Sequence, residues 1–189
     1  VTFLVAEGKS IVVRGPLDAG AIGAERIIVK RLDQRQPFGS FAVVANEGDN
    51  VRFSNVTITG GSEADIVGIQ FLGQLAVHGG KVWLDSIESS NSVSDDGVNI
   101  KHAQIFITRS KFIDNYSDQV DLDFCHGIVD NNDFNYSTKD SKETDSNADG
   151  LDISGSTILV LHNSLTNARD KAISVGERST VFLKNNTIT

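Results

Sequence analysis

Hydrophobic and polar residues alternate along most of the chain, in short runs that end at turn-forming residues. In Val51-Arg52-Phe53, for example, two apolar residues flank a charged one. This period of two is typical of strands with one face in a core, and no window shows the 3.6-residue period of an amphipathic helix. Because valine, isoleucine and threonine favour strands while asparagine, aspartate and serine favour turns, the pattern predicts an all-β protein.

The second half of the chain contains an internal repeat. Apolar residues recur in three columns with the same intervals, which are 22, 31 and 22 or 23 residues. The columns are Val98, Val120, Leu151 and Ile173; Ile107, Val129, Val160 and Leu183; and Phe112, Phe134, Leu165 and Ile188. Three columns in one register indicate a solenoid whose coils each contain several short strands.

A period near 22 predicts a right-handed single-stranded parallel β-helix, in which each coil pairs with the next. Length divided by period gives roughly seven coils, in a single domain over residues 1–189. The 31-residue interval contains extra polar residues in Asn135–Ala148, which predicts a surface loop. A similar step from Gly68 to Asn99 predicts a second loop within Leu72–Asp95.

One polar column runs beside the apolar ones and consists of Ser110, Asn132, Asn163 and Asn186. Stacked asparagines at a turn can bond to each other and to buried backbone groups of the next coil. We interpret this column as a structural asparagine ladder. The lone cysteine, Cys125, excludes an internal disulfide and is expected to be a small buried residue.

The charge and the lengths of the apolar runs argue against two classes of partner. Its net charge is −8 with 22% charged residues, so no basic face is available for phosphates, and nucleic acid is not an expected partner. No run of about eighteen apolar residues occurs, so membrane insertion is not expected either.

Candidate chemistry gathers on the predicted outer face of the repeat. If Val98 and Ile100 point inward, the alternating residues of that strand and its neighbours point outward, including aspartates in mid-strand positions that this residue normally avoids. The expected catalytic residues are Asp121, Asp152 and Asp123, and the expected substrate-binding residues are Lys101, Asn99, Asp118, Asp149 and Lys171. Stacked carboxyl groups repel each other unless a proton, a cation or a lysine compensates them.

Paired carboxyl groups can act as acid and base on a glycosidic bond. No resident cofactor or metal ion is expected, although carboxylates from successive coils are also the oxygen ligands that calcium prefers. Asp-Gly turns that merely begin strands are the structural alternative for Asp96 and Asp149. His102, just past the strand, is expected to be a turn residue rather than a catalytic base.

Several segments resemble the β-helix repeat regions of large bacterial surface proteins, including those beside spore-coat-H-like kinase domains. The resemblance rests on Gly8–Leu17, Pro37–Val43, Asp95–Lys101 and Asp149–Ser156. It implies a secreted or cell-surface module, a polysaccharide or glycan as partner, and further coils or domains of a longer parent chain. Such regions occur in non-catalytic proteins and in polysaccharide lyases, hydrolases and epimerases, and a shared fold does not choose among them. The expected function is therefore a rigid glycan-contacting scaffold, with a carbohydrate-active enzyme as the alternative.

Overall fold

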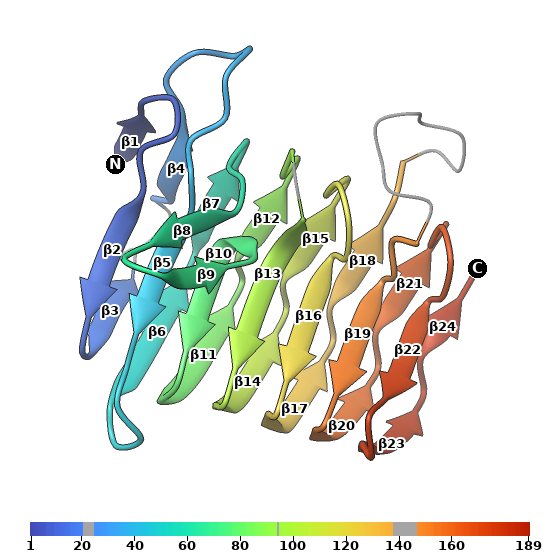
Figure 1. Cartoon of the computed structure of the whole chain (residues 1–189). Coiled ribbons are helices and arrows are strands. Elements are labelled where there is room, and N and C mark those ends of the chain that lie inside the picture. The colour runs from blue at the N-terminus through green and yellow to red at the C-terminus, as the bar shows by residue number, and fades with distance from the viewer. Residues whose placement is uncertain (21–24, 94, 138–146) are drawn as a thin grey trace.

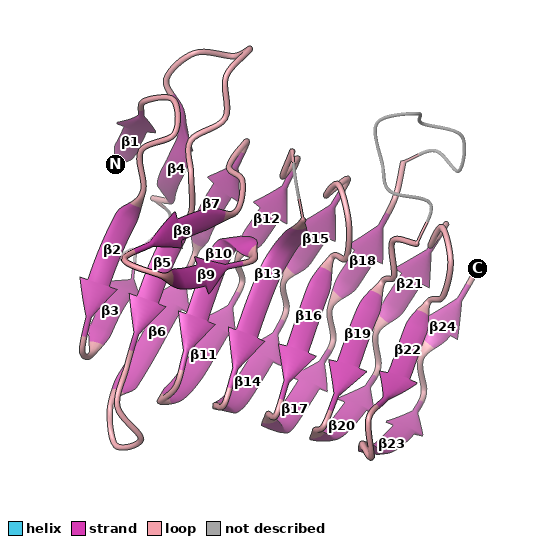
Figure 2. Cartoon of the chain, viewed as in Figure 1, coloured by secondary structure: helices cyan, strands magenta, loops and turns pink. Residues whose placement is uncertain are grey.

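The computed structural model describes residues 1–20, 25–93, 95–137 and 147–189. Within these ranges all regular elements are β-strands (Figure 2), and the termini lie at opposite ends of an elongated stack (Figure 1). Three long sheets run along this stack, and every pairing within them is parallel and has a defined register.

Each coil contributes one strand to each sheet, in the order sheet 1, sheet 2, sheet 3. Sheet 1 consists of β2 (Ile11–Arg14), β5 (Phe41–Val44), β10 (Gly73–His78), β13 (Asp96–Lys101), β16 (Val120–Asp123), β19 (Leu151–Ser154) and β22 (Ile173–Gly176). Sheet 2 consists of β3 (Leu17–Gly20), β6 (Asn50–Ser54), β11 (Lys81–Asp85), β14 (Gln104–Thr108), β17 (His126–Asp130), β20 (Thr157–Leu161) and β23 (Thr180–Lys184). Sheet 3 consists of β1 (Thr2–Val5), β4 (Ile27–Arg31), β7 (Val56–Thr59), β12 (Glu88–Ser90), β15 (Lys111–Ile113), β18 (Asp133–Asn135), β21 (Ser164–Thr166) and β24 (Thr187–Ile188).

This arrangement is the predicted parallel β-helix. Seven strands in each of sheets 1 and 2 give seven coils, as the sequence period indicates. The three apolar columns are confirmed, because Val98 pairs with Val120, Ile107 with Val129 and Phe112 with Phe134, and the register continues through the next coils. The sequence period therefore fixes the side-chain register as well as the number of coils.

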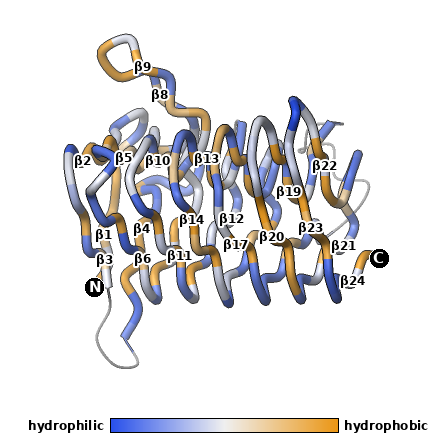
Figure 3. The backbone as a smooth tube through the Cα atoms, turned by 90° about the horizontal axis from the view of Figure 1, so that it is seen from below, coloured by the Kyte–Doolittle hydropathy of each residue, from blue (hydrophilic) through white to orange (hydrophobic). Residues whose placement is uncertain are grey.

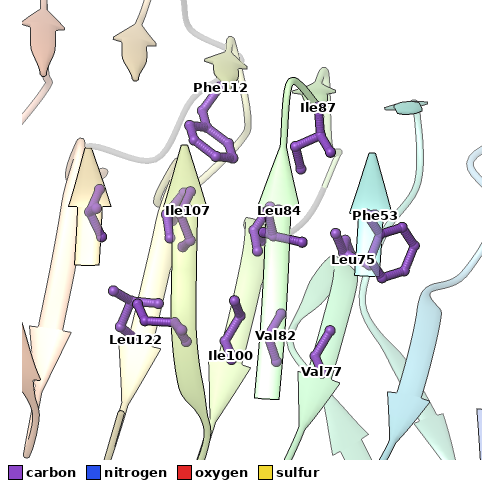
Figure 4. Packing of buried hydrophobic residues seen from close by; sticks show 14 of the residues in the cluster. Phe53, Leu75, Val77, Val82, Leu84, Ile87, Ile100, Ile107, Phe112 and Leu122 are labelled. Carbon is purple, nitrogen blue, oxygen red and sulfur yellow. The ribbon is translucent and has the colours of Figure 1, made fainter. Parts of the chain in front are cut away.

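The core is a continuous column between the three sheets, built from the inward side chains of every coil. Buried residues from Val5 to Leu165 form one cluster (Figure 4), and hydrophobic positions recur along each coil beside hydrophilic ones (Figure 3). Aromatic rings continue the stacking inside the core, where Phe112 and Phe134 lie 5.0 Å apart between ring centroids. Each coil is thus stabilised by burial against its two neighbours.

The asparagine ladder is confirmed at the corner between sheets 2 and 3. The side-chain oxygen of Asn163 accepts from the backbone N–H of Asn132 at 2.9 Å and from its amide nitrogen Nδ2 at 3.0 Å. The amide of Asn163 in turn donates to the carbonyl of Val129 at 2.9 Å. Asn186 repeats this arrangement one coil later, so the ladder supplies partners for turn groups that the sheets cannot pair.

The position predicted for the second loop, within Leu72–Asp95, is wrong. The extra residues lie before β10, where an antiparallel hairpin of β8 (Ala64–Ile66) and β9 (Ile69–Phe71) projects from the stack (Figure 3). The register partner of Asn99 is Ala76 rather than Gly68, which explains the error. Hairpin residues shield the outer face of sheet 1, since Phe71 packs with Ala42 and Ala76 in a second small apolar cluster. Of the other predicted loop, residues 138–146 lie outside the described residues.

The hairpin turn has a residue in an unfavourable conformation, and replacing it should stabilise the protein. Val67 is 87% exposed with a φ of 54°, a region that β-branched residues avoid. Val67→Asn creates an Asn-Gly turn with Gly68, which suits a two-residue hairpin, and is expected to raise the free energy of unfolding by about 0.5–1 kcal/mol. Thermal unfolding measures this gain. Val12→Asn, at an exposed strand position, should give no gain, and an unchanged Val67→Asn variant would contradict the prediction.

Candidate functional site

Six aspartates lie on β13, β16 and β19 or in the turns just before β16 and β19, and we call them the acidic face. Its members are Asp96, Asp118, Asp121, Asp123, Asp149 and Asp152. The predicted stacking is confirmed, because Asp121 pairs in register with Asp152 and lies next to Asn99 on the other side. Adjacent parallel strands are about 4.8 Å apart, so the side chains of Asp121 and Asp152 stand on neighbouring coils of one surface.

Asn99 is an outward residue that the structure nevertheless buries completely. Its amide nitrogen donates to Asp121 Oδ2 at 2.6 Å and to Asp96 Oδ2 at 3.3 Å, and its own Oδ1 has no partner. Asn99 is therefore not open to solvent, and its amide positions the Asp121 carboxyl group. Its expected role in substrate binding stays a prediction.

Asp118 and Asp149 form a second ladder rather than an open binding surface. Asp118 Oδ1 accepts the backbone N–H of Asp149, and Asp149 Oδ1 accepts that of Lys171, both at 2.7 Å. Asp149 is 5% exposed, so its carboxylate serves the backbone of the next coil. The structural interpretation of the Asp-Gly turn holds for Asp149. Lys171 keeps a half-exposed side chain, which pairs with Asp170 and lies 3.5 Å from Asp149 Oδ2.

Burial changes the protonation of the acidic face. Desolvation, followed by the charges of Asp123, Asp152 and Asp118, raises the pKa of Asp121 to about 8. Desolvation also raises the pKa of Asp118 to about 7, although the hydrogen bond from the Asp149 backbone opposes this shift. A proton on Asp121 at neutral pH offsets the like-charge repulsion that stacking would otherwise create.

Asp123 is held differently, by an ion pair. Lys101 Nζ lies 2.9 Å from Asp123 Oδ2, and both side chains are at most a quarter exposed. Burial lowers the pKa of Lys101, but the hydrogen bond and charge of Asp123 outweigh this and raise it overall. The acidic face thus combines a neutral carboxylic acid at Asp121 with a lysine-bound aspartate one position along the same face.

A pocket adjoins the acidic face at the corner between sheets 1 and 2, with a volume of about 440 Å³. Its lining combines one aromatic ring with charged and polar side chains, together with backbone at two glycines. It is lined by Glu47, Gly79, Gly80, Lys81, His102, Gln104, Phe124 and His126. Phe124 is 55% exposed, and its ring stacks on His102 with centroids 5.0 Å apart and planes 7° apart. His102 is a turn residue, as predicted, and also forms part of this pocket wall.

The corner backbone explains how Phe124 reaches the surface. Phe124 has a φ of 54°, a strained conformation for a bulky residue, and it turns the ring away from the core. Gly155 on the next coil leaves room for it, since a Cβ there would lie 2.7 Å from the ring. Strained residues often mark functional sites. Sequence reasoning missed this pocket, and the one available signal was an aromatic residue directly after the outward Asp123.

We next consider metal-binding groups and membrane-spanning helices in the part of the chain that the structure describes. In these residues no three or more histidine, cysteine, aspartate or glutamate side chains are grouped so that they could hold a metal ion. None of the described segments forms a helix of the length and apolarity needed to cross a membrane. Cys125 is 3% exposed, as expected, and burial raises the pKa of its thiol to about 12.

Comparison with known proteins bears on the fold. A search of the curated proteins finds no match to this chain. Residues 96–189, from β13 to the end of the chain, match the family model described as a right handed beta helix region. This matched segment holds four of the seven coils, and the earlier coils continue its three sheets in the same register. The chain is therefore a right-handed parallel β-helix whose residues 96–189 carry the signature of the right handed beta helix region family.

Proposed function

We propose that this β-helix is a secreted or cell-surface scaffold that contacts a glycan through the corner pocket and the acidic face beside it. The observation that carries the proposal is the pocket itself, which the half-exposed Phe124 lines together with Lys81, Gln104 and His126. Binding sites for small polar ligands combine apolar or aromatic contact with a few fixed polar groups on rigid elements. Sugar rings, with apolar C–H faces and hydroxyl edges, suit such a lining.

The stacked coils support this proposal because they hold the pocket without a lid or hinge. The pocket residues extend from strands and tight corners whose backbone is paired to the coil on either side. A ligand would therefore bind to a preformed surface and would not have to order a mobile loop. Carboxyl groups of the acidic face can accept hydrogen bonds from the hydroxyl groups of neighbouring sugars in the bound glycan, or donate hydrogen bonds to them.

Loss of the Phe124 ring is expected to weaken glycan binding. A glycan array identifies ligands, and titration of the best one should show binding about tenfold weaker for Phe124→Ala, since a central aromatic contact typically contributes over 1 kcal/mol. Phe3→Ala, which removes a similarly exposed phenylalanine from β1, is the matched control and should bind normally. Titrations with and without calcium test whether the acidic face uses a cation.

Two results would refute the scaffold proposal. One is an array without any glycan binding, and the other is a Phe124→Ala variant that binds as tightly as the unmodified protein. Equal losses in Phe124→Ala and Phe3→Ala would show a general effect on folding.

A carbohydrate-active enzyme is the second candidate, and one observation favours it. Asp121 is protonated at neutral pH and stands one coil from Asp152, so a carboxylic acid and a second carboxyl group share one surface. Neighbouring coils place carboxyl groups roughly 5 Å apart, close to the separation used by retaining glycosidases. Incubation of bound glycans with the protein, followed by analysis of chain length, separates the two candidates. Cleavage that Asp121→Asn abolishes supports the enzyme, whereas binding without cleavage supports the scaffold.

A further inference from the structure

The outer face of sheet 2 carries an apolar stripe, which we define as Trp83, Phe106, Ile128, Leu159 and Phe182. These five residues are paired in register on consecutive coils, and each is the middle residue of a five-residue strand. Leu159 and Phe182 are 42% and 57% exposed. Contiguous apolar patches on a surface are typical of sites that contact another macromolecule.

The ring geometry indicates what kind of partner fits the stripe. Trp83 and Phe106 are stacked with centroids 5.4 Å apart and planes 8° apart, and the Arg52 guanidinium lies 4.9 Å from the centre of the other Trp83 face. Both faces of the Trp83 ring and one face of the Phe106 ring are therefore occupied. Ring edges and aliphatic side chains pack well against another apolar surface, and few polar groups on the stripe itself could pair with the hydroxyl groups of a sugar.

Polar residues lie on both sides of the stripe, and on β11 they carry opposite charge. On β11 the stripe residue lies between Lys81 and Asp85, and on β17 it lies between His126 and Asp130. Two copies can meet through sheet 2 if they are related by a two-fold axis parallel to the long axis of the stack. The first residue of each strand then lies opposite the fifth residue of the same strand in the other copy. Lys81 then faces Asp85 of the other copy and the His126 imidazole faces its Asp130, while stripe meets stripe. Because Lys81 and His126 also line the corner pocket, the dimer contact and a glycan would compete for these two side chains. The surface is thus complementary to itself.

We propose that the outer face of sheet 2 joins two copies of this chain in a two-fold symmetric dimer with parallel stacks. Seven strands of about five residues cover roughly 17 by 30 Å, so contact would bury about 500 Å² per copy and about 1,000 Å² in total. This is the lower end of specific interfaces. We expect such a small contact to be weak, with a dissociation constant on the order of micromolar to tens of micromolar.

Sedimentation equilibrium of the full chain tests the dimer. The unmodified protein should associate between about 1 and 100 µM, and Ile128→Asp at the middle of the stripe should weaken association at least tenfold by burying a charge. Leu159→Lys is a second stripe variant with the same expected result. Lys111→Asp, an exposed change on sheet 3, is the control and should leave association unchanged. Far-ultraviolet circular dichroism confirms that each variant is folded.

Charge reversal tests the two-fold arrangement. Lys81→Asp should weaken the dimer because it places two aspartates opposite each other, and the double change Lys81→Asp with Asp85→Lys should restore it. Arg109, the partner of Asp85 within the chain at 2.6 Å, is 59% exposed and can turn away from a lysine there. A monomer at 100 µM, unchanged association of Ile128→Asp and Leu159→Lys, or no rescue by the double change would each overturn the proposal.

Discussion

Replacing Asn163 by alanine is expected to lower the free energy of unfolding by about 3 kcal/mol, because the change removes four side-chain hydrogen bonds at a buried corner. Asn163 accepts two bonds from Asn132 and donates to Val129 and to Asn186. Without these bonds, the backbone N–H of Asn132 is left without a partner and the carbonyl of Val129 loses one, at a corner where Asn163 is 2% exposed. Urea unfolding monitored by circular dichroism measures the loss.

Two further variants show whether the ladder is the cause. Asn163→Asp keeps an acceptor oxygen for Asn132 but cannot donate to Val129, so its loss should be intermediate. Asn50→Ala removes an exposed asparagine at the start of β6 and should change stability by less than about 0.5 kcal/mol. If Asn163→Ala unfolds at the same urea concentration as the unmodified protein, the ladder does not hold the corners.

The Asp121→Asn variant is expected to be more stable than the unmodified protein at pH 8–9, by at least roughly 2 kcal/mol. The folded pKa of Asp121, about 8, lies above that of an unfolded aspartate, so the native state holds the extra proton between these values. The stabilising contribution of the protonated Asp121 is therefore complete below about pH 4, and it is lost as the pH rises from there through about 8. An uncharged asparagine removes this dependence and can still accept the bond from Asn99.

Unfolding measured from pH 4 to pH 9 provides the comparison. The curve of the variant should be flatter than that of the unmodified protein and should meet it near pH 4. Asp18→Asn, an exposed change on β3, should keep the original slope. A variant that loses several kcal/mol at every pH would show that the Asp121 carboxyl group is needed for structure, and the proposed role of the acidic face would then be wrong.

The fold could be predicted because a β-helix repeats one short pattern along the chain. Each column needs the same residue type in every coil, so Val98, Val120 and Leu151 reveal the register directly. The N-terminal coils could not be aligned in this way, because the β8–β9 hairpin interrupts the period before β10. The hairpin was misplaced for that reason, and its burial of Ala76 could not be foreseen.

The candidate site was predicted only in part. Alternation correctly placed Asp121 and Asp152 on the outer face, since parity within a strand depends on sequence alone. Exposure depends on neighbours in three dimensions, and Asn99 is buried because the carboxyl groups of Asp96 and Asp121 enclose it. The corner pocket is formed by residues from four separate coils, so no contiguous motif could identify it.

Changes in chain length are concentrated at the corner that leads from sheet 3 to sheet 1. The hairpin lies there between β7 and β10, and the 15 residues between β18 and β19 belong to the same corner. Only two residues, Gly79 and Gly80, join β10 to β11 at the next corner. The largest differences in length therefore lie along one border of the stack, beside the acidic face. Related proteins could exchange ligands by lengthening or replacing these connections, and a designer could graft a foreign loop there without changing the three sheets.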